Sequence, residues 1–319
     1  MTDLMVETVG LRKTFKGRGA VVEAVRGVDL RVAAGEIFGF LGPNGAGKTT
    51  TLRMLATLLE PTEGSATVAG ADLTREPGRV RERIGYVAQG GGSDPGMTGR
   101  GELVIQGRLF RLGRGEAQAR ASEVLAALDL TDAADRRIGT YSGGMRRRLD
   151  IGIGMVHRPR LLFLDEPTTG LDPQARAHLW DEIRLLRDGG ATIFLTTHYL
   201  EEADALCDRL AIIDHGRIVA EGTPIELKRQ IAGDVVTFGL DASSDAALAV
   251  LRVAPGVREA ELADRVVRLY VEDGETALPD LLRRLDGAGL SPASISLARP
   301  SLDDVFLRQT GRSLRDAAA

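Results

Sequence analysis

The sequence has little cysteine and no long apolar run. A single cysteine, Cys207, cannot form a disulfide within the chain, which excludes a disulfide scaffold and fits a reducing compartment. No apolar stretch approaches the roughly 18 to 20 residues of a membrane span, and the first residues lack the basic-then-apolar pattern of a signal peptide. We therefore expect a protein on the cytoplasmic side that works at a membrane only through a partner.

An excess of either charge is also missing. Lys and Arg number 41 against 45 Asp and Glu, which gives a formal net charge of −4. The chain as a whole therefore lacks the basic surface of a nucleic-acid-binding protein, and any phosphate must be held locally. Lysine itself is scarce, so a lysine inside a motif is informative. The lysines are Lys13, Lys16, Lys48 and Lys228.

The length of 319 residues favours two domains. In the first, short apolar runs alternate with helical patterns, which is typical of an α/β fold with parallel strands. The pattern predicts a helical insertion without strands from about residue 99 to 156. The expected strands are 28–32, 37–41, 161–164, 193–197 and 210–213, the last forming a hairpin with 218–219, and the expected helices are 48–59, 178–187 and 200–207.

The pattern of expected strands and helices changes after about residue 230. Residues 233–311 show the order β-α-β-β-α-β, compatible with a small ferredoxin-like α+β domain whose sheet keeps one face free. The expected elements are strands 235–240, 257–262, 266–271 and 295–297 and helices 245–252 and 277–285. Leu302, Val305 and Phe306 then fall on one side of a short helix, either as an amphipathic anchor for a partner or as core.

A glycine-rich loop between an expected strand and an expected helix carries the first chemical signal. It matches the pattern G-x-x-x-x-G-K-[ST], in which backbone N–H groups and a helix N-terminus cradle phosphates. Lys48 would reach the β- and γ-phosphates and the Thr49 hydroxyl would bind Mg²⁺. The alternative is a plain helix-capping turn. The loop comprises Gly42, Pro43, Asn44, Gly45, Ala46, Gly47, Lys48, Thr49 and Thr50.

Two acids end the apolar run at 161–164. Asp165 would hold Mg²⁺, and Glu166 would orient or deprotonate the attacking water. Two acids after a strand often only cap a turn, but a phosphate loop earlier in the chain favours the metal-and-base interpretation.

The run Tyr141–Met145 predicts a second helix N-terminus suited to an anion. Ser142 has an N-cap side chain, and Gly143 and Gly144 allow close backbone approach. One nucleotide hardly needs two such sites from one chain. A head-to-tail homodimer explains both.

These elements, in this order, resemble the ATP-binding subunits of ABC transporters over residues 4–230, with a helical subdomain at about 90–156. The resemblance implies that Gln89 is the Q-loop glutamine, a Mg²⁺ ligand that senses the membrane partner. It makes Gly170–Asp172 the D-loop, His198 the switch histidine and Phe15 the adenine-stacking aromatic. Tyr141 and Met145 depart from the family's Leu-Ser-Gly-Gly-Gln signature, so no glutamine contact carries over.

A closer resemblance, to drug-export ATPases of the daunorubicin-resistance type, rests on Tyr141–Asp150, Met54–Leu59 and Pro300–Leu307. It implies a homodimeric ATPase, with ATP and Mg²⁺ as cofactors, that drives efflux of a hydrophobic compound. A separate transmembrane permease is the implied partner, and the ATPase itself would be peripheral on the cytoplasmic side of the cell membrane. The catalytic residues would be Glu166, His198 and Lys48, with Thr49, Gln89 and Asp165 at the metal.

Other interpretations remain open at this point. An importer ATPase would share every catalytic residue, whereas a soluble ABC clamp in DNA repair would need long coiled coils for which the 94 residues between Lys48 and Ser142 leave no room. Taken singly, Gln89 could be a surface residue, Phe15 a core or edge aromatic and His198 a helix-start histidine. The triple arginine 146–148 is either a solvated face or a neighbour of the triphosphate.

Overall fold

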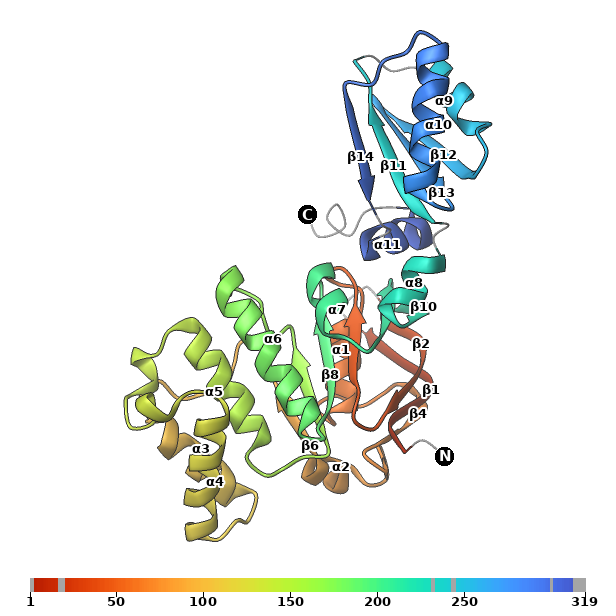
Figure 1. The fold of residues 1–319 in the computed structure, drawn as a ribbon. Helices are drawn as coiled ribbons and strands as arrows, with labels where there is room; N and C mark the ends of the chain where they lie inside the picture. Colours follow the sequence, from red (N-terminus) through yellow and green to blue (C-terminus); the bar gives the residue numbers. More distant parts are fainter. Residues whose placement is uncertain (1–2, 17–20, 231–232, 242–244, 299–300, 312–319) are drawn as a thin grey trace. The chain divides into compact units, whose positions relative to one another are not determined.

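The computed structural model describes residues 3–16, 21–230, 233–241, 245–298 and 301–311 (Figure 1). The described residues form two compact units, one up to Thr223 and one from Pro224 onward. The sequence analysis placed residues 224–230 at the end of the first region. The structure instead puts this segment, helix α8 (Pro224–Gln230), in the second unit, because it packs against the C-terminal helix α11 (Leu302–Thr310) and buries Leu227.

A six-stranded sheet forms the centre of the first unit, in the order β10-β9-β3-β8-β7-β6. All neighbours are parallel except β10, which forms the expected hairpin with β9. Every residue of β3, β7 and β8 is buried, as the continuous apolar runs predict for parallel strands. The strands are β3 (Ile37–Leu41), β6 (Ile84–Val87), β7 (Leu161–Asp165), β8 (Thr192–Thr197), β9 (Arg209–Asp214) and β10 (Arg217–Gly222).

A second, antiparallel sheet in this unit has the order β2-β1-β4-β5. Its strands are β1 (Leu4–Lys16), β2 (Val21–Ala33), β4 (Glu63–Val68) and β5 (Ala71–Asp72), of which the sequence predicted only part of β2. Repeated register shifts in β1 break the alternation of polar and apolar residues, so its pattern did not indicate a strand.

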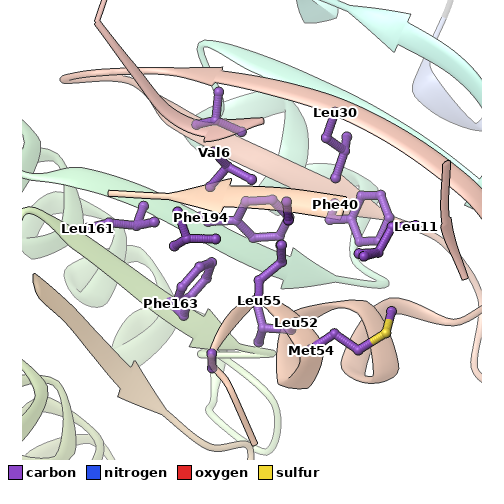
Figure 2. Close-up of a cluster of buried hydrophobic side chains, with 14 of the residues drawn as sticks. Val6, Leu11, Leu30, Phe40, Leu52, Met54, Leu55, Leu161, Phe163 and Phe194 are labelled. Carbon is purple, nitrogen blue, oxygen red and sulfur yellow. The ribbon is translucent and has the colours of Figure 1, made fainter. Parts of the chain in front are cut away.

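The core of the first unit joins both sheets to helix α1 (Lys48–Leu55) (Figure 2). Phe194 lies within 5.7 Å, centroid to centroid, of Phe38, Phe40 and Phe163. Helix α1 is shorter than the predicted 48–59, because Thr57 has φ 62° and Leu58 is exposed rather than part of the core. The other helices of the first unit outside the segment between β6 and β7 are α2 (Pro77–Arg83), α6 (Pro173–Asp188) and α7 (Leu200–Leu206).

The segment between β6 and β7 is helical, as predicted. Among its described residues the β-structure is an isolated bridge between Thr98 and Arg137. Its helices pack around their own apolar cluster, which includes Leu103, Leu125 and Leu149. They are α3 (Gly99–Leu109), α4 (Arg114–Ala127), the 3₁₀ turns η1 (Thr131–Ala133) and η2 (Ile138–Thr140), and α5 (Gly143–Met155).

The second unit has the predicted β-α-β-β-α-β order. Its antiparallel sheet runs β12-β13-β11-β14, the strand order of a ferredoxin-like fold, and α9 and α10 pack against the face carrying Val236 and Phe238. The expected fold class, an α/β cassette with a small α+β domain, is confirmed. The elements are β11 (Asp234–Gly239), α9 (Asp245–Arg252), β12 (Val257–Ala263), β13 (Val266–Val271), α10 (Gly274–Gly287) and β14 (Ser294–Ala298).

The C-terminal helix α11 settles one open alternative. Leu302, Val305 and Phe306 are 2%, 1% and 0% exposed, so they are core residues and not an exposed amphipathic anchor. The other face of the sheet is also not wholly free, because Glu261 and Tyr270 line a cavity of about 420 Å³ together with residues of α11.

Candidate functional site

The loop Gly42–Thr50 joins the buried strand β3 to α1 and holds its lysine inward. Lys48 is 4% exposed, and its Nζ donates to the carbonyls of Gly42 (2.7 Å) and Pro43 (3.1 Å). Gly47 has φ 109°, and a Cβ there would lie 2.6 Å from the Ala24 carbonyl, so only glycine fits. No side chain caps the N-terminus of α1. The loop therefore presents a lysine and free backbone N–H groups, which is the chemistry of a phosphate site.

Asp165 lies at the carboxyl end of β7, beside the loop. Its Oδ1 accepts hydrogen bonds from the hydroxyls of Thr49 (3.0 Å) and Thr196 (2.7 Å). Mg²⁺ prefers oxygen ligands and is usually held by one or two carboxylates together with substrate phosphates. The residues fit Mg²⁺ in that manner. A cation cage of three or more His, Cys, Asp or Glu is not found among the described residues.

Glu166 is the centre of the polar network. Its Oε1 lies 3.3 Å from Lys48 Nζ, and its Oε2 lies 3.1 Å from His198 Nδ1. Oε2 also accepts from Gln89 Nε2 (2.9 Å) and from the Thr169 hydroxyl (3.2 Å). The structure therefore brings together Lys48, Gln89, Glu166 and His198, which the sequence placed in one site although they span 150 residues.

The backbone and charge of Glu166 are both unusual. Its φ is 44°, in the left-handed region that favours glycine, and its side chain is 7% exposed. Burial alone would raise the pKa of Glu166 above 4.5. The hydrogen bond from His198 and the charge of Lys48 lower the pKa by more than burial raises it, so that it lies at about 2. Burial lowers the pKa of Lys48 against the attraction of Glu166. The glutamate is therefore ionised at neutral pH and paired with the lysine.

Lys48 and Glu166 line a cavity of about 350 Å³. Ala24 of β2, the loop residues and Gln89 line it together with Glu166. Phe15 is not among the lining residues. Its ring is 42% exposed at the end of β1, with Lys13 Nζ 5.4 Å from the ring centroid. The adenine-stacking role of Phe15 stays a prediction.

The Tyr141–Met145 run lies in a different cavity, of about 560 Å³. Ser142 is the N-cap of α5, where its Oγ accepts from the Met145 N–H (3.2 Å), and Gly143 and Gly144 follow it into the helix. The D-loop residues Gly170–Asp172 line the same cavity, and none of its lining residues belongs to the Lys48 cavity. Within one chain, the structure therefore does not bring Ser142–Gly144 to the phosphate loop.

Three polar residues of this region were not singled out as site residues from the sequence. Thr196 bonds Asp165 because β7 and β8 pair in parallel with these residues in register. Arg147 is 7% exposed and Arg148 donates to Glu182 from a mostly buried position, so the triple arginine is not a uniformly solvated face. The only hint in the sequence that these arginines belong to the site was their position on the helix that begins after Ser142.

Comparisons with known proteins agree with this geometry. Residues 25–169 match the ABC transporter family model, and residues 222–310 match the model of the C-terminal domain of ATP-binding proteins like DrrA1-3.

The chain is 48% identical to the daunorubicin resistance ATP-binding protein DrrA2 of Streptomyces coeruleorubidus, over 93% of each chain. It is also 48% identical to the daunorubicin/doxorubicin resistance ATP-binding protein DrrA of Streptomyces peucetius, over 98% of this chain and 94% of that one. A dimeric ATP-binding cassette in a post-hydrolysis state, bound to ADP and Pi, superposes with a TM-score of 0.63 at 25% identity. The match covers 69% of this chain and 98% of the other.

Proposed function

Because the chain belongs to the ABC transporter family, among the ATP-binding proteins of the daunorubicin-resistance type, we propose that its two cavities are halves of one ATP site. The chain is the ATP-hydrolysing subunit of an exporter. Two copies arranged head to tail would bring Ser142–Gly144 of one copy against a triphosphate on Lys48 of the other. The observation that carries this proposal is that the two anion sites share no lining residue.

The residues suggest how the site works. Lys48 and the α1 N–H groups would bind the β- and γ-phosphates, while Thr49, Asp165 and Gln89 would provide oxygen ligands for Mg²⁺. The chemistry that this ion would supply is neutralisation of phosphate charge. As Lys48 turns from Glu166 to the phosphates, the Glu166 carboxylate loses a paired cation, its pKa rises, and it becomes a better base for the attacking water. His198 keeps the carboxylate oriented.

A mixing experiment tests the shared site. Lys48→Ala removes the phosphate lysine, and Ser142→Arg blocks the α5 N-terminus. A dimer of either variant alone should therefore contain no complete ATP site and hydrolyse no ATP. A dimer containing one copy of each variant has one intact site, formed by Lys48 of the Ser142→Arg copy and Ser142 of the Lys48→Ala copy. We expect single-turnover hydrolysis only in the mixture. No hydrolysis in the mixture, or equal hydrolysis by either variant alone, would reject the shared site.

The transported molecule and the membrane partner are further parts of the proposal. Relatives named for daunorubicin and doxorubicin resistance support export of a hydrophobic compound. None of the described helices is both long and apolar enough to cross a membrane. In this proposal the transport path lies in a separate permease. The ATPase would sit as a peripheral subunit on the cytoplasmic side of the cell membrane.

We assign the permease contact to a third cavity, of about 880 Å³. Strand β6, which leads into Gln89, forms part of its wall, and Leu58, Leu109 and Phe110 line it with 57%, 70% and 39% of their surface exposed. Phe110 stacks on His157 with 3.7 Å between ring centroids. Because Arg81, Glu82 and Arg111 line the same cavity, an amphipathic cytoplasmic helix of the permease would fit it. Leu109→Asp should abolish co-purification with the permease without changing ATP affinity, and an undiminished complex would contradict the assignment.

A further inference from the structure

Helix α5 reaches from the Ser142 cavity to the backbone next to Gln89 and Glu166, which line the Lys48 cavity. Its N-terminus, Ser142–Gly144, lies at one cavity, and one turn later Arg147 and Asp150 point into the interior, 7% and 6% exposed. They are spaced i and i+3, so they share a face of the helix.

Arg147 holds the backbone on either side of the catalytic residues. Its Nη1 donates to the Ala88 carbonyl (2.7 Å), its Nε to the Pro167 carbonyl (2.7 Å) and its Nη2 to the Asp165 carbonyl (3.0 Å). Ala88 precedes Gln89, and Asp165 and Pro167 flank Glu166. One planar guanidinium thus fixes the two segments that carry Gln89 and Glu166.

Asp150 holds the far end of the same loop. Its Oδ1 accepts from the backbone N–H groups of Gly92 (3.2 Å) and Ser93 (3.1 Å). Gly91 has φ 72°, and a Cβ there would lie 2.4 Å from Asp150 Oδ2, so the loop passes directly against the carboxylate. Residues 88–93 are therefore bound to α5 at both ends, with Gln89 between the attachments.

Charge and burial make this attachment specific to arginine. Burial lowers the pKa of Arg147, while Asp150 and Asp165 oppose that change. A buried cation is costly unless its donors are satisfied, and here backbone carbonyls satisfy three separate nitrogens. A lysine ammonium could keep the charge but could not span three carbonyls in one plane.

We propose that Arg147 and Asp150 form a positioning clamp that couples the nucleotide contact at the start of α5 to the hydrolytic residues of the same chain. The inference rests on the proposed function, in which the α5 N-terminus touches the nucleotide held by the second copy. A shift of α5 on that contact moves Gln89 and the Glu166 backbone of its own site. Occupation of one site thereby sets the rate at the other, and ATP hydrolysis is cooperative.

The test uses the full chain assembled with its permease. Arg147→Gln should lower kcat by about 10- to 100-fold, because small misplacement of catalytic groups has effects of that size. ATP affinity should stay within about twofold, since Lys48 is untouched, and the Hill coefficient for ATP should fall towards 1. Arg147→Lys should recover part of kcat.

A matched control is Arg120 of α4, which binds the C-terminal end of α5. Arg120 donates to the carbonyls of Met155 (2.9 Å) and Val156 (3.1 Å), so Arg120→Gln removes similar bonds from α5 without touching the clamp. It should lower stability while leaving kcat and the Hill coefficient unchanged. If Arg147→Gln does not fold, Gly91→Ala perturbs the clamp from the loop side and should give the same loss of kcat at unchanged ATP affinity.

The outcomes separate the two proposals. A failed mixing experiment with Lys48→Ala and Ser142→Arg rejects the shared site itself. Successful mixing together with a cooperative, fully active Arg147→Gln or Gly91→Ala rejects the clamp alone. An equal loss of kcat and of cooperativity in Arg120→Gln would also reject it, because the effect would then be a general weakening of α5.

Discussion

The two units of this chain bury different kinds of side chain. In the first unit, charged and hydroxyl groups gather at the ends of β7 and β8 and bond to one another, whereas the buried side chains described in the second unit are apolar. Buried polar groups stabilise little in net terms but fix positions closely. The first unit is thus organised around a reaction, and the second around packing.

The largest effect should come from Glu166→Gln in the first unit. The amide keeps the shape and the phosphate loop is intact, but no carboxylate remains to accept a proton. Steady-state ATPase activity should fall by about 10²- to 10⁴-fold with ATP affinity nearly unchanged. Size-exclusion chromatography with ATP should show a stable dimer. Turnover at the wild-type rate would contradict the role of Glu166.

A pair of core substitutions tests whether the units are energetically separate. Phe238→Ala in β11 empties a fully buried position and should destabilise the second unit by about 3 to 5 kcal/mol, leaving ATP affinity within twofold. Phe194→Ala in β8 has a similar cost, but its strand leads to Thr196 and His198, so ATPase activity should fall as well. Calorimetry and nucleotide titration check both. Loss of ATP binding in Phe238→Ala would show that the units depend on each other.

The smallest effect concerns Glu182, a buried acid that lines neither half of the proposed ATP site. Burial raises the pKa of Glu182 to about 7 from 4.5, although Arg148 opposes the change. The folded protein therefore holds a proton that the unfolded chain releases between those values, so this contribution to stability is present below pH 4.5 and lost as pH rises through 7. Asp129 adds to the shift, and His178 Nε2 lies 3.3 Å from the carboxylate.

Urea unfolding of Glu182→Gln measures that contribution. Between pH 4.5 and 8 the wild type should lose roughly 2 to 3 kcal/mol relative to the variant. Glu123→Gln is the control, because the exposed Glu123 carboxylate has its pKa lowered by Arg120 and should show no such loss. Parallel pH curves for wild type and Glu182→Gln would contradict the buried-acid explanation.

The residues of the candidate site were predictable wherever they form a motif that is local in sequence. Each of these motifs occupies a few consecutive residues. The phosphate loop lies between an expected strand and an expected helix, the acids directly follow an expected strand, and Ser142 begins an expected helix. The parallel strands β3, β7, β8 and β9 were predicted for the same reason, since buried strands are continuous apolar runs. The parallel edge strand β6 was not predicted, because its four residues Ile84–Val87 are too short a run to stand out.

The contacts that could not be predicted from the sequence depend on strand register and on packing. Thr196 meets Asp165 only because β7 and β8 align without offset, and Arg147 is buried only because the loop after β6 folds onto α5. Arginines 146–148 look alike in the sequence, yet the first is exposed and the second buried. The sheet containing β1 was missed because its register shifts interrupt the alternation of side chains.

The left-handed backbone at Glu166 has a consequence for which residues can replace it during evolution. With φ at 44°, a glutamate costs conformational energy that glycine or asparagine would not. Under the proposed function, selection for hydrolysis would keep the carboxylate there despite that cost. A duplicated copy that no longer needed to hydrolyse ATP would gain stability by replacing it, so glycine or asparagine here would identify a lineage that has kept the fold and given up the reaction.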